Sequence, residues 1–160
     1  MIYIGVDPGL KGGLFAMIND NLHRSVMPTT MVKNKQKLDE RKIAKWFEDF
    51  AFSLDSIIVT IELVHAMPKQ GGVSMFTFGM GYGIIQGICL GLEFPYQLVR
   101  PQEWQKEMLK GQPKGSEYLV ASRLWPEIDW RATERSKKPH DGMVDAALIC
   151  EYGRRTRREE

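Results

Sequence analysis

Short runs of apolar, largely β-branched residues punctuate the chain and predict five strands. Each run ends at turn-forming or polar residues, and the runs are Ile2–Val6, Leu14–Ile18, Leu22–Met27, Ile57–Ile61 and Tyr96–Val99. The first three follow one another with only turns between them, so they predict an antiparallel meander. The fourth is continuously β-branched, which is typical of a parallel strand that is covered on both faces.

Apolar residues recur at helical spacing in the remaining stretches. They predict helices over Leu38–Phe52, Ser74–Leu92, Gln102–Leu109, Ser116–Trp125 and Asp141–Arg154. Ser74 is the expected N-cap of its helix, and the Lys-rich stretch 28–37 is predicted to be a loop. This order predicts an α/β fold: a five-stranded mixed sheet, an antiparallel meander followed by parallel strands, flanked by helices on both faces.

The second predicted helix carries a glycine every fourth residue, at positions 79, 83, 87 and 91. Each glycine inside a helix costs about 0.5–1 kcal/mol relative to alanine, so the stripe predicts close packing against the sheet or a second copy of the helix. No charged residue occurs between Gly71 and Leu92, but the glycines and several polar residues make the stretch too polar for a membrane span. We therefore expect a buried helix.

Length and composition describe an ordinary globular chain. With 160 residues, 43% of them hydrophobic and 26% charged, the sequence predicts one domain over residues 1–160 whose last few residues are disordered. The net charge of +2 is too small to identify a partner. Cys89 and Cys150 both fall in helical patterns, which favours a reducing compartment without disulfides. Because the chain starts directly with a strand, we expect no signal or transit segment and a cytoplasmic location.

Two predicted strands end in a carboxylate, Asp7 after the first and Glu62 after the fourth. The last helix adds Asp141 and Asp145, which lie one turn apart on one face. Asp7 by itself is more typical of the Pro-Gly turn that follows it. Because functional residues gather at the carboxyl ends of strands in open α/β sheets, the four acids together predict one site. Four neighbouring carboxylates need a counter-charge, and ligands that are all oxygen favour Mg²⁺, with Mn²⁺ as a substitute. Two such metal ions held by carboxylates are typical of sites that cleave phosphodiesters.

Four motifs, taken in order, resemble the RuvC-type Holliday junction resolvases of the ribonuclease H-like superfamily. They are the strand IYIGVDPG, the strand IIVTIE, the Gly-rich helix SMFTFGMGYG and the helix start HDGMVDAA. The phrase MPKQG and the ending HDG-x-x-DA are most similar to phage-encoded and plastid-type members. The resemblance covers the chain from Met1 to about Arg154.

The resemblance implies that Asp7, Glu62, Asp141 and Asp145 are the catalytic metal ligands, with two Mg²⁺ ions per site. Bacterial members space the last two acids three residues apart, whereas this chain spaces them four apart. The third ligand is therefore either Asp141 or His140, a histidine that is also typical of a simple helix-start contact.

The resemblance also implies a homodimer that binds four-way junction DNA, with a dimer contact that involves the Ser74–Leu92 helix. In the loop where many bacterial members carry an aromatic wedge, this chain has His65, a second accessory candidate. Phe76 and Phe78 are its substitutes, although the helical pattern favours core positions for both. The expected DNA-binding side chains are basic or polar, and they are Lys69, Gln70, Ser74, Lys106, Lys110, Lys137 and Lys138.

Together these features predict an Mg²⁺-dependent endodeoxyribonuclease that resolves four-way junctions by symmetric paired nicks through metal-activated water. The expected setting is the cytoplasm of a bacterial cell or a phage-infected host, with no membrane partner. Two alternatives stay open. One is a broader branched-DNA or RNA/DNA-hybrid nuclease on the same fold, and the other is a junction-binding protein without turnover.

Overall fold

The computed structural model describes residues 1–63 and 71–157, and it is built around a five-stranded sheet with the strand order β3-β2-β1-β6-β7. Its strands are β1 (Ile2–Asp7), β2 (Gly13–Ile18), β3 (Asn21–Val26), β6 (Ile57–Glu62) and β7 (Tyr96–Val99). The first three pair antiparallel, whereas β6 runs parallel to both β1 and β7. The predicted mixed sheet is confirmed.

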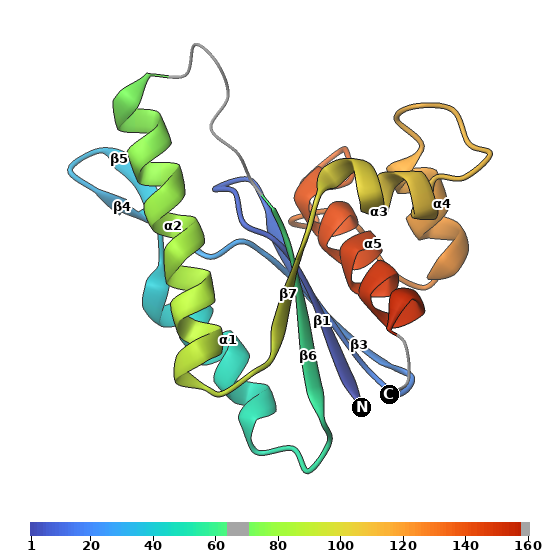
Figure 1. Ribbon diagram of the computed structural model, residues 1–160. Helices are drawn as coiled ribbons and strands as arrows, with labels where there is room; N and C mark the ends of the chain where they lie inside the picture. The colour runs from blue at the N-terminus through green and yellow to red at the C-terminus, as the bar shows by residue number, and fades with distance from the viewer. Residues whose placement is uncertain (64–70, 158–160) are drawn as a thin grey trace.

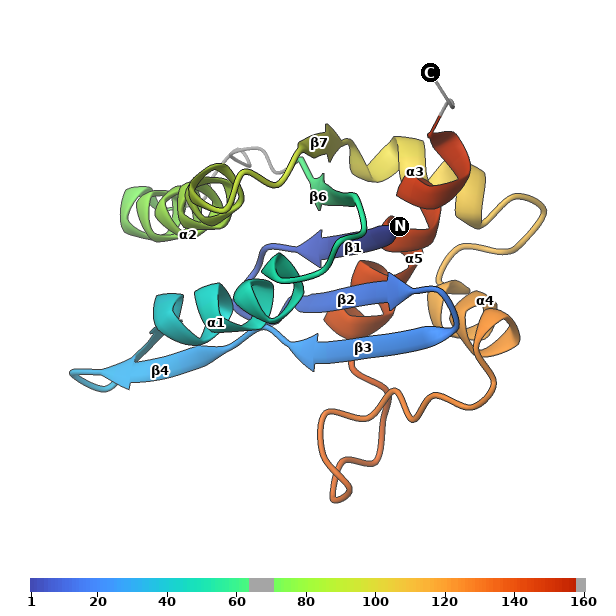
Figure 2. The ribbon, with the colours of Figure 1, turned by 90° about the horizontal axis from the view of Figure 1, so that it is seen from below.

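Helices cover both faces of this sheet, as predicted (Figures 1 and 2). They are α1 (Glu40–Ala51), α2 (Gly72–Gly91), α3 (Pro101–Met108), α4 (Glu117–Leu124) and α5 (Asp141–Thr156). One hydrophobic core lies between the sheet and the helices α1 and α2, and a second lies under α3, α4 and α5. Cys89 is buried in the first core and Cys150 in the second, and both are free thiols.

The stretch predicted as a loop over residues 28–37 is instead a β-hairpin. Its strands are β4 (Thr29–Val32) and β5 (Lys35–Leu38), which pair with each other and form a separate two-stranded sheet. Lys33 and Asn34, with φ angles of 46° and 61°, form the two-residue turn. Two residues in the left-handed conformation match the twist of a two-residue hairpin turn. The strands are polar, so the hydrophobic pattern of the sequence did not predict them.

Helix α2 begins before the predicted start, because Gly71 and not Ser74 is its N-cap. The backbone of Gly71 is extended, with φ −64° and ψ 141°, and its carbonyl accepts the first helical hydrogen bond from the Met75 N–H at 3.1 Å. Glycine is tolerated at an N-cap without a side-chain acceptor. Ser74 therefore lies inside the first turn.

The glycine stripe of α2 does not pack against the sheet, so that half of the prediction is wrong. The residues that face the core are Gly81, Ile85 and Cys89, on the opposite side of the helix. A Cβ placed on any glycine of the stripe meets no described atom within 4 Å. Phe76 lies with the stripe and is 73% exposed, so its expected core position is also wrong. The helix is buried on one face only, and no helix in the described part of the chain is long and apolar enough to cross a membrane.

Candidate functional site

The ends of β1 and β6 bring two carboxylates to adjacent positions on one edge of the sheet. These strands are parallel, and their last register pair is Val6 and Ile61. The next residue of each strand is an acid, Asp7 or Glu62. Parallel pairing in this register therefore places the two carboxylates side by side, as the shared edge of two strand ends requires.

Helix α5 reaches the same edge because glycines on three elements remove the side chains that would separate them. A Cβ on Gly142 would overlap the carbonyl oxygen of Lys11, in the turn that follows Asp7. A Cβ on Gly13 would be 2.5 Å from the Gly142 carbonyl oxygen, and one on Gly5 would overlap the Ala146 carbonyl oxygen. This backbone-to-backbone packing fixes the first turns of α5 against β1 and β2.

The start of α5 arranges the remaining candidate ligands. His140 is the N-cap residue, and its Nδ1 accepts a hydrogen bond from the Met143 N–H at 3.3 Å. His140 thus has the predicted helix-start contact, and its Nδ1 is used as the acceptor of that hydrogen bond. Asp141 is the exposed first residue of the helix, whereas Asp145 is half-buried one turn later. Of these, Asp145 is the acid that depends most on the packing of α5.

Burial and mutual repulsion act on the two strand-end acids. Burial is the main cause that raises the pKa of Asp7 to about 7, the charge of Glu62 raises it further, and a hydrogen bond from the Gly9 N–H opposes the shift. Burial also raises the pKa of Glu62, while the hydrogen bond from Trp104 lowers it. That bond runs from the buried indole Nε1 to Glu62 Oε1 at 2.8 Å. Trp104 therefore holds one carboxylate in place.

Asp145 interacts electrostatically with all the other acids at this edge. Its pKa is raised to about 8, first by burial and then by the charges of Asp7, Glu62, Glu117 and Asp141, in that order. Carboxylates arranged in this way favour a bound cation, because a positive charge removes the repulsion. Asp145 is therefore coupled electrostatically to the other three predicted acids.

Glu117 and Tyr118 belong to this region and were missed by the sequence analysis. They help line a cavity of about 280 Å³, whose other walls come from Gly115, Asp141, Val144 and Asp145. Glu117 lies in the first turn of α4, where an acid is ordinarily explained by the helix dipole. No sequence signal distinguishes it, because only the packing of α4 against α5 brings it to the acids.

The donor chemistry of the edge fits a hard divalent cation, since every candidate ligand offers carboxylate oxygen. Within residues 1–63 and 71–157, however, no three His, Cys, Asp or Glu side chains are already gathered into a ready-made ligand set. The carboxylates are near enough to repel one another, but are not drawn together around a common point. The residues that would hold Mg²⁺ or Mn²⁺ are Asp7, Glu62, Asp145 and Asp141.

The predicted DNA-binding lysines lie on exposed surface around α3 and before α5. Lys106 is exposed on α3, Lys110 just follows that helix, and Lys137 and Lys138 are exposed in the segment before α5. None of them forms an ion pair with another described residue. His65, Lys69, Gln70 and the side chain of Ser74 lie outside the described part of the structure.

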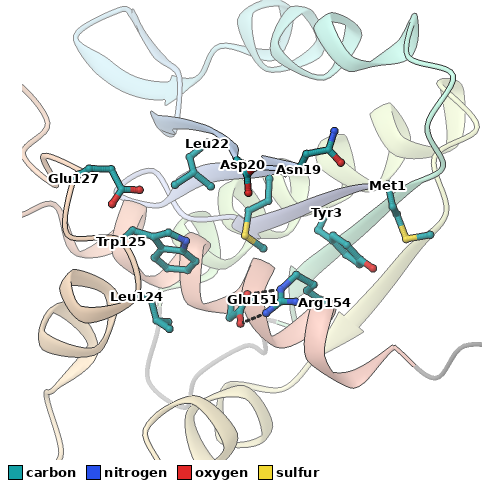
Figure 3. Close-up of a pocket in the computed structure, with 11 residues that line it drawn as sticks. Met1, Tyr3, Asn19, Asp20, Leu22, Leu124, Trp125, Glu127, Glu151 and Arg154 are labelled. Carbon is teal, nitrogen blue, oxygen red and sulfur yellow. Dashed lines mark hydrogen bonds and ion pairs between the residues drawn. The ribbon is translucent and has the colours of Figure 1, made fainter.

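A second and larger cavity lies at the other end of the sheet (Figure 3). It measures about 650 Å³, and its walls include the start of β1, the β2–β3 turn and the second half of α5. Glu151 and Arg154 line it as an ion pair, with a distance of 2.7 Å between the carboxylate and guanidinium atoms. None of the predicted site residues lines this cavity. This cavity is therefore separate from the acidic edge.

Solved structures with the same architecture come from Holliday junction resolvases. The chain is similar to the Thermus thermophilus RuvC structure, with a TM-score of 0.57 and 13% identity over 97% of this chain and 96% of that one. For T. thermophilus RuvC in complex with Holliday junction substrate, the TM-score is 0.62, with 14% identity over 97% and 95%. For the yeast mitochondrial Holliday junction resolvase Ydc2, the values are 0.54 and 15%, over 93% and 75%.

These identities are low, so the likeness shows a RuvC-like, ribonuclease H-like fold and does not by itself assign an activity. No family model and no curated protein matches the chain. The fold shared with the resolvases covers 97% of this chain.

Proposed function

We propose that this chain is a structure-selective endonuclease that resolves four-way DNA junctions by symmetric paired nicks. The observation that carries the proposal is the electrostatic coupling of Asp145 on α5 to Asp141 and to the acids that end β1 and β6, in a fold that is similar to RuvC. Among family members, the motifs of this chain are most similar to phage-encoded and plastid-type resolvases, acting in the cytoplasm.

In this proposal Asp7, Glu62, Asp141 and Asp145 hold two Mg²⁺ ions, for which Mn²⁺ substitutes. The cations would supply Lewis-acid activation of water and charge neutralisation at the scissile phosphate. The chain positions the ligands: Trp104 orients Glu62 through its indole N–H, and the glycine contacts hold the first turns of α5, which carry Asp145, against β1 and β2. His140 supports the helix start as its N-cap, which leaves Asp141 as the preferred third ligand.

DNA would approach this edge along exposed basic surface. Lys106 and Lys110 on one side and Lys137 and Lys138 on the other have no acidic partner among the described residues, so their charges are available to phosphates. Lys69, Gln70 and Ser74, with His65 as an accessory residue, complete the proposed contacts beyond Glu62.

Paired nicks require two active sites, and the open face of α2 supports a homodimer. Phe76, Met80 and Leu90 are 73%, 44% and 66% exposed, and they share that face with the glycine stripe. Glycines without a Cβ neighbour allow a second helix to approach closely, which would account for their cost in helix stability. Phe76, at the start of this face, is the proposed substitute for the aromatic wedge.

The substitution Asp7→Asn tests the proposal. Cleavage of a synthetic four-way junction in Mg²⁺ should be abolished, because the carboxylate is lost without a change in shape, while junction binding should persist. Unchanged cleavage would refute the assignment of the site.

A substrate panel separates the alternatives. Junction, linear duplex and RNA/DNA hybrid, each with Mg²⁺ or with EDTA, should give Mg²⁺-dependent cleavage of the junction in preference to the others. Equal cleavage of the three would indicate the broader nuclease. Binding without any cleavage would indicate the non-catalytic binder.

A further inference from the structure

The β4–β5 hairpin is a defined arm and not a loose connection. All residues from Thr30 to Lys37 are exposed, so the hairpin buries little of itself. Its base is nevertheless fixed, because the Asp39 N–H donates to the Pro28 carbonyl at 2.9 Å. Leu38 at the end of β5 packs against α2, where a Cβ on Gly81 would lie 2.7 Å from Leu38 Cδ1. The arm is thus held at its base and free along its length.

The arm starts at the same sheet edge as the candidate site. Strand β3 runs in the same direction as β1, because both pair antiparallel with β2, and so it ends at the edge where Asp7 lies. The Met27 N–H after β3 donates to the Gly12 carbonyl at 2.9 Å, in the turn that follows Asp7. Figure 2 shows the hairpin continuing outward from the end of β3. A strand of four residues is about 13 Å long, so the hairpin reaches about that far from its base.

The arm carries an uncompensated positive charge. It holds Lys33, Lys35 and Lys37, and no acid occurs between Pro28 and Leu38. None of the three lysines forms an ion pair within the described chain, in contrast to Lys42 and Lys45 on the adjacent α1, which pair with aspartates.

The lysines are also arranged along one line. Lys35 and Lys37 are two apart on one strand and therefore point to the same face of the hairpin, with Lys33 at its tip. None of the ion pairs in the described chain neutralises these three lysines, so they repel one another. The successive phosphates of a DNA strand would neutralise them.

We propose that this hairpin is a DNA-binding arm whose lysines contact the phosphate backbone of a duplex arm outside the point of cleavage. The inference rests on the proposed function, since it is the nuclease edge that brings DNA to the base of the hairpin. The contacts are with the backbone and carry no sequence preference. The arm supplies affinity and placement, not chemistry.

The test measures binding and cleavage separately in the full chain. Fluorescence anisotropy with a labelled four-way junction, in EDTA and over a salt series, compares the wild type with Lys33→Gln/Lys35→Gln/Lys37→Gln. Each phosphate contact contributes about 0.9 to the slope of log K against log salt, so the triple variant should lower the slope by about 2–3 and the affinity by about 10- to 100-fold near 0.1 M salt. Cleavage at saturating protein in Mg²⁺ should stay within about threefold of the wild type, since the acids are untouched.

Two further variants control for net charge and folding. Lys42→Gln/Lys45→Gln/Arg131→Gln removes the same charge from side chains that are already ion-paired, and should leave the slope unchanged. The triple Lys→Arg variant of the arm should bind like the wild type. An arm variant with the wild-type slope, or a control triple with the same loss, would overturn the proposal. If the wild type binds the junction through the arm but cuts nothing, the arm stands and the nuclease assignment fails.

Discussion

Replacement of Asp7 by Asn should stabilise the metal-free protein while it removes activity. The environment raises the pKa of Asp7 from 3.8 to about 7, mainly through burial and secondarily through Glu62. A difference of roughly three units at about 1.36 kcal/mol each sets an upper value of about 4 kcal/mol for holding this carboxylate ionised in the folded state. Asn has the same shape, and its Oδ1 can still accept the Gly9 N–H, but it carries no charge.

The gain should depend on pH in a defined direction. Below about pH 4 the carboxyl is protonated in both folded and unfolded chains, so the variant gains nothing. As the pH rises from about 4 to 7 the unfolded chain releases its proton first, and the wild type loses stability. Above about pH 7 both states are ionised, and the difference stays at roughly 2–4 kcal/mol. For a chain of this size that corresponds to a melting temperature about 5–15 °C higher.

Thermal unfolding in EDTA at pH 4.5 and pH 8.5 measures this effect. Added Mg²⁺ should stabilise the wild type and leave the variant unchanged, because a ligand of the folded state raises its stability by mass action. Asp141→Asn is the matched control: this side chain is exposed, so its replacement should change stability by less than about 1 kcal/mol. An Asp7→Asn protein that is no more stable than the wild type at pH 8.5 would refute the electrostatic argument for the site.

Three further predictions follow from single contacts. Trp104→Phe removes the 2.8 Å hydrogen bond to Glu62, which should raise the pKa of that carboxyl and the Mg²⁺ concentration needed for half-maximal cleavage by about tenfold, with recovery at high Mg²⁺. Gly142→Ala forces a Cβ into the Lys11 carbonyl and should destabilise the fold by about 2–4 kcal/mol in chemical denaturation, whereas Gly83→Ala, in open space, should not. Gly83→Glu should give a monomer in analytical ultracentrifugation that keeps the circular dichroism spectrum of the wild type; a persisting dimer would exclude the α2 face as its contact.

The sequence by itself determined the main strands and the acids at their ends. A strand such as Ile57–Ile61 is visible because β-branched side chains favour extended backbone and because burial on both faces demands an unbroken apolar run. The sheet-edge position of Asp7 and Glu62 follows from those strands, since parallel neighbours end together. The spacing of Asp141 and Asp145 placed them on one helix face for the same local reason.

Local signals also explain where the sequence-based prediction was wrong. The β4–β5 hairpin is polar and exposed, so no alternation of hydrophobic residues predicts it. Its two-residue turn, with Lys33 and Asn34 in the left-handed conformation, is visible only in the structure. The glycines of α2 predicted close packing, but they did not determine which face of the helix would meet the sheet. That choice depends on the apolar residues opposite them, Ile85 and Cys89, which the core selects.

Only the tertiary structure decided how the site is assembled. Gly142 lies between the two aspartates of α5, and the reason for a glycine there appears only where the backbone of α5 meets the Lys11 carbonyl. Trp104 and Glu117 come from helices far along the chain, and each reaches the acids through packing between helices and sheet. Such contacts join residues that are distant in sequence, so no local sequence pattern predicts them. The end of a strand is predicted from the residues next to it in the chain, whereas the burial that raises the pKa of Asp7 comes from the tertiary structure.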